Sequence, residues 1–147
     1  MTPLATIGYE GATVQRLVET LREARVELLV DVRAVANSRR PGFSKTALAA
    51  SVGEAGIGYL HLRALGTPAE GRAAARAGRH DEMRAVFAEQ LSTPGAQAEL
   101  ETLAGLVRAG RRACLLCFEA DPAHCHRTLV ASALREIVPV EVVELAP

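Results

Sequence analysis

Short apolar runs alternate along this chain with segments in which apolar residues recur at helical spacing. Continuous apolar stretches within residues 27–32 and 113–118 are typical of strands that are buried on both faces of a parallel sheet. Similar short runs at residues 6–8, 57–62 and 138–145 predict three further strands. The pattern therefore predicts about five strands, separated by segments long enough to form helices.

The helical segments show apolar residues three and four positions apart. This spacing predicts helices that begin near Val14, near Met83, near Leu100 and after Pro122, while Ser44 is a plausible N-cap for a helix that runs toward residue 55. A turn at residues 93–95 is expected to separate the helix that begins near Met83 from the helix that begins near Leu100. The Ala- and Arg-rich stretch of residues 66–81 has no clean period, so an exposed helix and a mobile loop both remain open.

This order of elements predicts the fold class. Strands that alternate with helices point to a three-layer α/β protein with a mostly parallel sheet and helices on both faces, Rossmann-like or flavodoxin-like. With 147 residues, 49% of them hydrophobic, the chain has the size of one compact domain covering residues 1–147.

Composition limits the partners and the compartment. No apolar run approaches the ~20 residues that span a bilayer, and the first residues lack the plan of a signal peptide. We therefore expect no membrane partner. Three cysteines cannot all pair with one another, so we expect free thiols, which suit a cytoplasmic location. The formal net charge is zero, so the protein as a whole has no excess positive charge that would attract nucleic acid. The sequence does not indicate the oligomeric state.

Functional groups follow three of the predicted strands. Tyr9 and Glu10 follow the first strand, Asp31 and Arg33 lie at the end of the second, and Glu119 follows the strand at residues 113–118. Because ligands of parallel α/β sheets bind beyond the carboxyl ends of the strands, we expect these groups to meet at one edge of the sheet.

The segment after this last-mentioned strand contains the densest cluster of ionisable residues. Asp121 and Pro122 predict a helix start, which places the residues from His124 to Arg127 in the first turns. A helix N-terminus attracts anions and favours a thiolate, so Cys125 is the candidate reactive thiol.

The other two cysteines have a different expected place. Cys114 and Cys117 are three residues apart in a strand, so they point to opposite faces and cannot form a redox pair. Both are expected to contribute to the core.

A zinc site made of Cys117, His124, Cys125 and His126 is the competing interpretation. Consecutive residues of a helix diverge by about 100°, so residues 124, 125 and 126 cannot all face one ion without unwinding. The sequence therefore predicts no metal site, and it predicts no cofactor.

Two carboxylates and a basic loop complete the candidate chemistry. Glu119 is a candidate general base or nucleophile, and Asp31 is either its partner or the residue that orients an arginine. The loop that follows Arg33 carries Arg39, Arg40 and Lys45 without a carboxylate and suits an anion, although a solvated basic loop is the simpler alternative. Gly8 and Gly11 could let the backbone approach a phosphate, while the arginines of residues 72–79 are expected to form a solvated face.

The chain resembles one protein family over nearly its whole length. The matching stretches are IGYEG at residues 7–11, DVRAVANSRRPGFSK at 31–45, YLHLRALG at 59–66 and LLCFEADPAHCHRTLVASAL at 115–134. On these stretches the chain is similar to the domain of unknown function (DUF) 488 family. That family has no established activity, so the resemblance implies a fold and the position of a site rather than a reaction. The positions that match its motifs are Asp31, Arg33, Ser38, Arg39, Tyr59, Leu65, Gly66, Cys117, Glu119, Cys125, His126 and Arg127.

The leading hypothesis is an enzyme, of hydrolase or transferase type, that acts on a small anionic substrate such as a nucleotide or a phosphorylated compound. The candidate catalytic residues are Glu119, Asp31 and Cys125. The candidate substrate-binding residues are Tyr9, Arg33, Ser38, Arg39, Cys117, His126 and Arg127. The alternatives are a noncatalytic module that binds nucleic acid or a phosphorylated ligand, and a thiol-dependent redox or sulfur-transfer protein.

Overall fold

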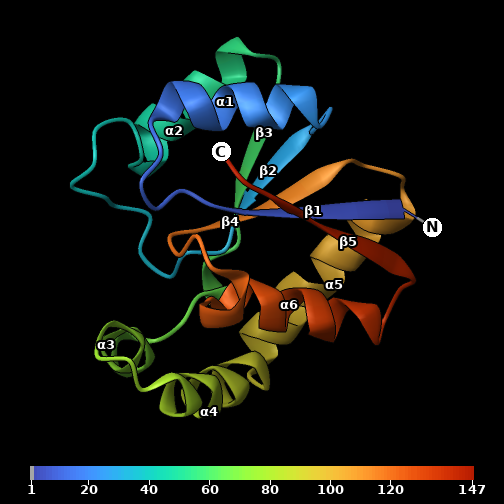
Figure 1. Cartoon of the computed structure of the whole chain (residues 1–147). Coiled ribbons are helices and arrows are strands. Elements are labelled where there is room, and N and C mark those ends of the chain that lie inside the picture. The colour runs from blue at the N-terminus through green and yellow to red at the C-terminus, as the bar shows by residue number, and fades with distance from the viewer. Residues whose placement is uncertain (1) are drawn as a thin grey trace.

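A sheet of five parallel strands forms the middle layer of the protein, which a computed structural model describes over residues 2–147 (Figure 1). The strands are β1 (Thr2–Gly8), β2 (Leu28–Asp31), β3 (Gly58–His61), β4 (Ala113–Cys117) and β5 (Val140–Leu145). Their order across the sheet is β3-β2-β4-β1-β5, and each neighbouring pair is parallel. The predicted three-layer α/β class is confirmed.

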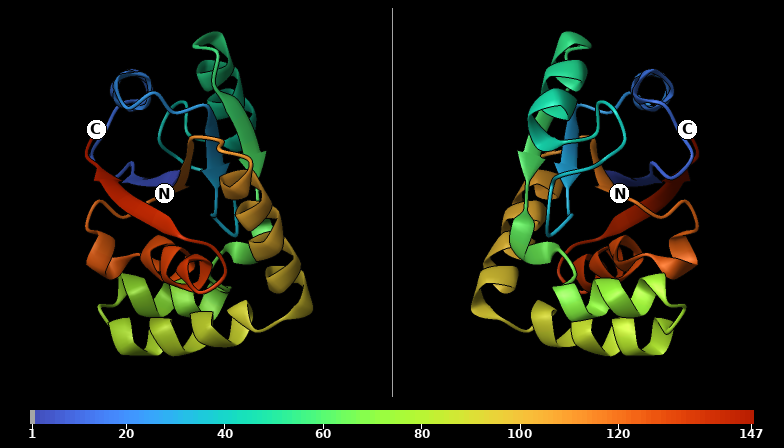
Figure 2. Two further views of the ribbon diagram at one scale, coloured as in Figure 1. Left: turned by 90° about the vertical axis from the view of Figure 1, so that its right-hand side faces the viewer. Right: turned by 90° about the vertical axis from the view of Figure 1, so that its left-hand side faces the viewer.

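Helices cover both faces of this sheet (Figures 1 and 2). One face packs against α1 (Val14–Glu23) and α2 (Lys45–Glu54), and the other packs against α5 (Pro94–Arg108) and α6 (His126–Arg135). Below α5 and α6 lie α3 (Ala69–Arg76) and α4 (His80–Leu91), which pack against each other. Two short 3₁₀ turns, η1 (Arg63–Leu65) and η2 (Pro122–His124), complete the elements.

The Ala- and Arg-rich stretch, for which the sequence left two alternatives, forms α3. Its packing depends on small residues: Gly71 and Ala74 are buried, and a Cβ atom on Gly71 would lie 2.5 Å from Thr67 Cγ2 and 3.1 Å from Val86 Cγ1. The helix α3 contacts α4 through small residues instead of large apolar ones. Its sequence therefore lacks the apolar stripe by which a buried helix is usually predicted.

The turn at residues 93–95 starts a helix rather than merely separating two. Thr93 Oγ1 accepts a hydrogen bond from the backbone N–H of Ala96 at 3.3 Å, and Pro94 takes the first helical position. The capping residue and the proline together fix where α5 begins.

The strand order creates a topological switch point between β1 and β4. These strands are neighbours, with Gly8 opposite Cys117, yet the chain leaves β1 toward α1 on one face and leaves β4 toward α6 on the other. The diverging connections open a crevice at the carboxyl ends, which is where open α/β sheets bind ligands.

Among residues 2–147, no helix has the length and apolar character needed to cross a membrane.

Candidate functional site

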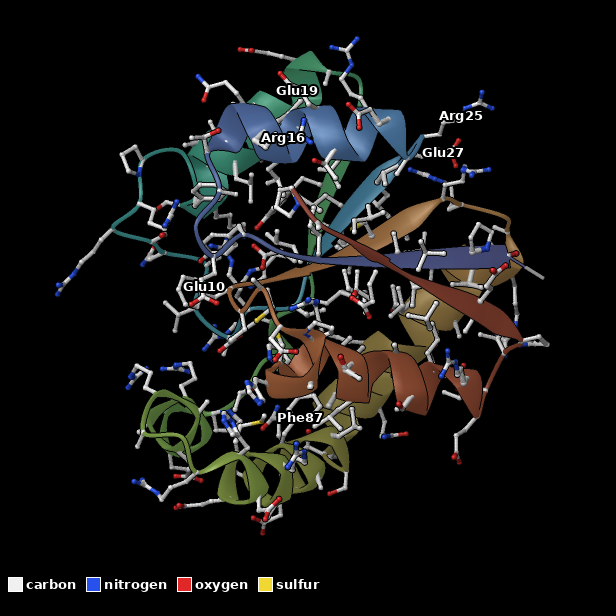
Figure 3. The ribbon with its side chains drawn as sticks, in the orientation of Figure 1. Glu10, Arg16, Glu19, Arg25, Glu27 and Phe87 are labelled. Atoms are coloured by element: carbon white, nitrogen blue, oxygen red, sulfur yellow. The ribbon has the colours of Figure 1, made fainter. Side chains whose placement is uncertain are left out.

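A cavity of about 420 Å³ lies at the carboxyl ends of β1, β2 and β4. Its size is within the range of small-molecule sites. Side chains from three sheet ends and from α3 and α4 line it, and these include Tyr9, Glu10, Arg33, Thr67, Arg72, Arg76, Met83, Cys117, Glu119 and His126. The predicted meeting of the three strand ends is therefore found in the structure, and Figure 3 labels Glu10 at this edge of the sheet.

Backbone contacts between the ends of β1 and β4 shape this edge. Glu10 N donates to Phe118 O at 2.8 Å, and Glu10 Oε1 accepts from Ala120 N at 3.1 Å. A Cβ atom on Gly8 would lie only 1.8 Å from the backbone oxygen of Glu119. Gly8 thus serves the close crossing of the chain after β4 over β1, where the sequence had suggested an approach to a phosphate.

The candidate residues at the end of β2 form a closed ion pair. Arg33 Nε and Nη2 donate to Asp31 Oδ1 and Oδ2 at 2.9 and 2.7 Å, and Arg33 Nη1 donates to Phe43 O at 2.7 Å. Asp31 is fully buried and also accepts hydrogen bonds from Arg33 N and from Tyr59 OH. Both Asp31 oxygens are occupied, so this carboxylate positions Arg33 and has no lone pair directed at a ligand.

Tyr9 and Tyr59 enclose this ion pair. Arg33 Nη1 donates to Tyr9 OH at 3.2 Å, and the Tyr9 ring stacks on Phe43 with ring centroids 4.5 Å apart. Burial alone would lower the pKa of Arg33, but hydrogen bonds with Asp31 and its charge raise that pKa above the ordinary value. Burial and the hydrogen bond to Asp31 raise the pKa of Tyr59 as well. The network therefore holds a permanent cation and a neutral phenol beside the cavity.

Two thiols and an imidazole meet at the floor of the cavity. The Sγ atoms of Cys117 and Cys125 and a ring nitrogen of His126 all lie within 4.8 Å of one another, and all three residues are buried. Cys117 Sγ is 3.4 Å from His126 Nδ1 and 3.7 Å from Glu119 Oε2. The His126 ring lies 5.2 Å, centroid to centroid, from Phe87 of α4, which Figure 3 labels below α6.

The backbone at the start of α6 explains how adjacent residues converge. The sequence predicted one helix from Pro122, but η2 ends at His124 and Cys125 is an extended N-cap with φ −123° and ψ 140°. Cys125 and His126 are therefore not successive helical residues, and the divergence of about 100° per helical residue does not apply to this pair. His124 is exposed and lies near Asp121, outside the cluster.

The cluster perturbs the protonation of its members. The hydrogen bond with Cys125 and burial raise the pKa of Cys117, whereas hydrogen bonds from Cys117 and His126 outweigh burial and lower the pKa of Cys125. Burial works against the charged form of His126, but Cys125 raises the pKa of this imidazole. Burial and the neighbouring Cys125 raise the pKa of Glu119 to about 7.

Arg127 lies on the other side of the loop that follows β4. Its Nη1 donates to Glu119 O, its Nη2 donates to Ala120 O at 3.3 Å, and its Nε donates to Thr6 Oγ1 at 3.2 Å. Only 1% of Arg127 is exposed. The expected substrate contact is thus replaced by a structural one, because the guanidinium holds the backbone that carries Glu119.

The basic residues of the loop after Arg33 do not line the cavity. Arg39 is exposed and lines a separate hollow with Arg40 and Pro41, while Arg40 Nη2 donates to Ala12 O. Ser38 Oγ accepts from Arg40 N at 3.1 Å, and Ser38 N donates to Ser44 Oγ at 3.0 Å. Ser38 and Arg39 are therefore residues of the loop itself, and the structure does not bring them to the strand-end cavity.

Sequence reasoning missed the contribution of α3. The sequence placed Arg72 and Arg76 on a solvated face, but both line the cavity: Arg72 is half-buried there, and Arg76 is exposed at its edge. Of the nearby acids, Glu82 pairs with Arg79 and Asp81 pairs with Arg84, and within the described residues neither pairs with Arg72 or Arg76. The sequence carried no signal for this placement, because Gly71 and Ala74 mark only the buried side of α3, and Arg72 and Arg76 lie on other sides of the helix.

Fold and site together define a parallel α/β protein with a ligand-sized cavity at the switch point of its sheet. Comparison with family models gives a match to "Domain of unknown function DUF488" over residues 13–134, and the chain belongs to this family. The resemblance seen in the sequence is confirmed. Searches of curated proteins and of solved structures found no match.

Proposed function

We propose that this protein is an enzyme that acts on a small anionic substrate, a nucleotide or a phosphorylated compound, in the strand-end cavity. One observation carries the proposal: arginines from α3 and a carboxyl, thiol and imidazole group from the chain around β4 line the same 420 Å³ space. Cations bind the charged part of a ligand, and the groups near β4 supply the chemistry.

Arg72 and Arg76 are the residues that bind the anion. Arg72 Nη1 donates to Thr67 O at 2.9 Å, which fixes the side chain and leaves its other N–H groups for a ligand. No carboxylate of residues 2–147 lies within ion-pair distance of either guanidinium. Guanidinium groups suit phosphate and carboxylate because their donors match the planar or tetrahedral oxygens in pairs.

Glu119 is the catalytic residue that transfers a proton. It is half-buried at the cavity wall, and its Oε2 lies 3.7 Å from Cys117 Sγ. Arg127 positions the backbone of Glu119, and Asp31 positions Arg33. A positioned carboxyl group beside a bound substrate accelerates proton transfer by about 10²–10⁴-fold.

A binding measurement tests the anion site. The double variant R72A/R76A is expected to bind inorganic phosphate and adenosine monophosphate at least about tenfold more weakly in calorimetry, because each charged hydrogen bond contributes about 1.5–3 kcal/mol. The matched control is R16A/R22A, which removes the same charge from the exposed surface of α1, where Figure 3 labels Arg16. Equal loss in both double variants, or no loss in R72A/R76A, contradicts the proposed site.

The noncatalytic nucleic-acid module receives less support from the geometry. Arg39 and Arg40 lie at a different hollow from the reactive groups, so a nucleic acid on that loop would leave the cavity unused.

All three cysteines are unpaired and buried, which suits the reducing environment of the cytoplasm, and we propose that location.

A further inference from the structure

The cluster of Cys117, Cys125 and His126 has a geometry that anion binding and proton transfer do not require. Three soft or borderline ligand atoms lie within 4.8 Å of one another and are 94% or more buried. A core packed for stability alone has no reason to direct two sulfurs and a ring nitrogen at one point. Thiolate and imidazole are the ligands that proteins use for zinc.

The edge of this triangle between Cys117 and His126 fits a tetrahedral ion. Zinc binds sulfur at about 2.3 Å and histidine nitrogen at about 2.0–2.1 Å, which separates the two ligand atoms by about 3.6 Å at tetrahedral angles. The distance between Cys117 Sγ and His126 Nδ1 is 3.4 Å. These two ligand atoms are therefore already spaced as a tetrahedral ion requires, and the sulfur of Cys125 lies within 4.8 Å of both.

The far side of the His126 ring is arranged as in a metal ligand. Its Nε2 lies 2.7 Å from Val32 O, and because a carbonyl only accepts, Nε2 carries the proton. In the neutral form that binds a metal, the ring then has its lone pair on Nδ1, which faces Cys117. A hydrogen bond from the second ring nitrogen to a backbone carbonyl is the usual outer contact of zinc-binding histidines.

We propose that Cys117, Cys125 and His126 bind one Zn²⁺ ion at the floor of the cavity. Cys117 and His126 line the cavity and Cys125 closes the site from behind, so the fourth position faces the cavity, flanked by Glu119. Three protein ligands with one open position are typical of catalytic rather than structural zinc. The proposal adds to the proposed function, and the phosphate assay of R72A/R76A tests that function separately.

Metal titration of the purified, reduced protein tests the site. After removal of bound metal with a chelator, the protein is expected to bind one equivalent of Co²⁺, with the thiolate charge-transfer band and strong visible bands of a tetrahedral complex. Zn²⁺ is expected to displace the cobalt and bleach both. The wild-type spectrum alone decides this point, so the test does not depend on the folding of any variant.

Cysteine variants locate the ion. C117A and C125A are each expected to weaken Zn²⁺ binding by more than the about 10–100-fold that loss of an outer contact costs. The matched control is C114A, because Cys114 is equally buried but lies among residues of the opposite face of the sheet. Failure to bind one equivalent, a spectrum without thiolate bands, or equal weakening in C114A overturns the zinc site. Retained phosphate binding in that case leaves the proposed function standing.

Discussion

Replacing Asp31 by Asn is expected to lower the free energy of unfolding by about 3–5 kcal/mol, the usual cost of breaking a buried ion pair from one side. Asp31 is fully buried and binds Arg33 through two oxygens, while only 5% of Arg33 is exposed. Asn keeps the shape but removes the charge, so the guanidinium stays buried without its counter-ion. Urea unfolding followed by circular dichroism measures the loss.

An exposed ion pair on α4 is the control for this prediction. Arg79 Nε and Glu82 Oε2 are 2.6 Å apart, but about half of each side chain is exposed. E82Q is therefore expected to change stability by no more than about 1 kcal/mol. If D31N lowers the free energy of unfolding no more than E82Q does, Asp31 does not stabilise the protein as the counter-ion of Arg33.

The second large effect is expected on activity. E119Q is expected to lower turnover by at least about 100-fold while the melting temperature stays close to that of the wild type, because a carboxamide cannot exchange the proton. Turnover is measured as the consumption of phosphorylated compounds from a metabolite extract, followed by mass spectrometry. Glu119 is only half-buried, and its backbone is held by Arg127 independently of its side chain, so folding does not require the carboxyl group.

A remote glutamate provides the comparison for E119Q. Glu54 is exposed at the end of α2, so E54Q is expected to consume the same compounds at the wild-type rate. Full activity per folded molecule in E119Q excludes Glu119 as the proton-transfer residue. So does a collapse of stability that accounts for all the lost activity.

Most of the fold could be predicted because its signals are local. Buried parallel strands leave continuous apolar runs, and the five expected strands are the five observed. The start of β1 was missed because Pro3 breaks the pattern, although β1 pairs with β5 from Thr2 onward. The helix α3 was left open because Gly71 and Ala74 pack through their small size, which produces no hydrophobic period.

The site was predictable only as far as topology determines it. The ends of β1, β2 and β4 had to meet, so the common position of Tyr9, Arg33 and Glu119 at one edge of the sheet could be predicted. The extended backbone at Cys125 was not foreseeable from the helix signals around it, and this conformation brings Cys125 and His126 together. Long side chains can also turn either way, which is why Arg127 binds backbone carbonyls and Arg72 lines the cavity.

The position of a bound anion tests the central claim most directly. Crystals of the protein soaked in phosphate are expected to show the ion inside the strand-end cavity, within hydrogen-bond distance of Arg72 or Arg76. Phosphate at the Arg39–Arg40 hollow, with the strand-end cavity empty at the same concentration, would contradict the assignment of this cavity as the substrate site.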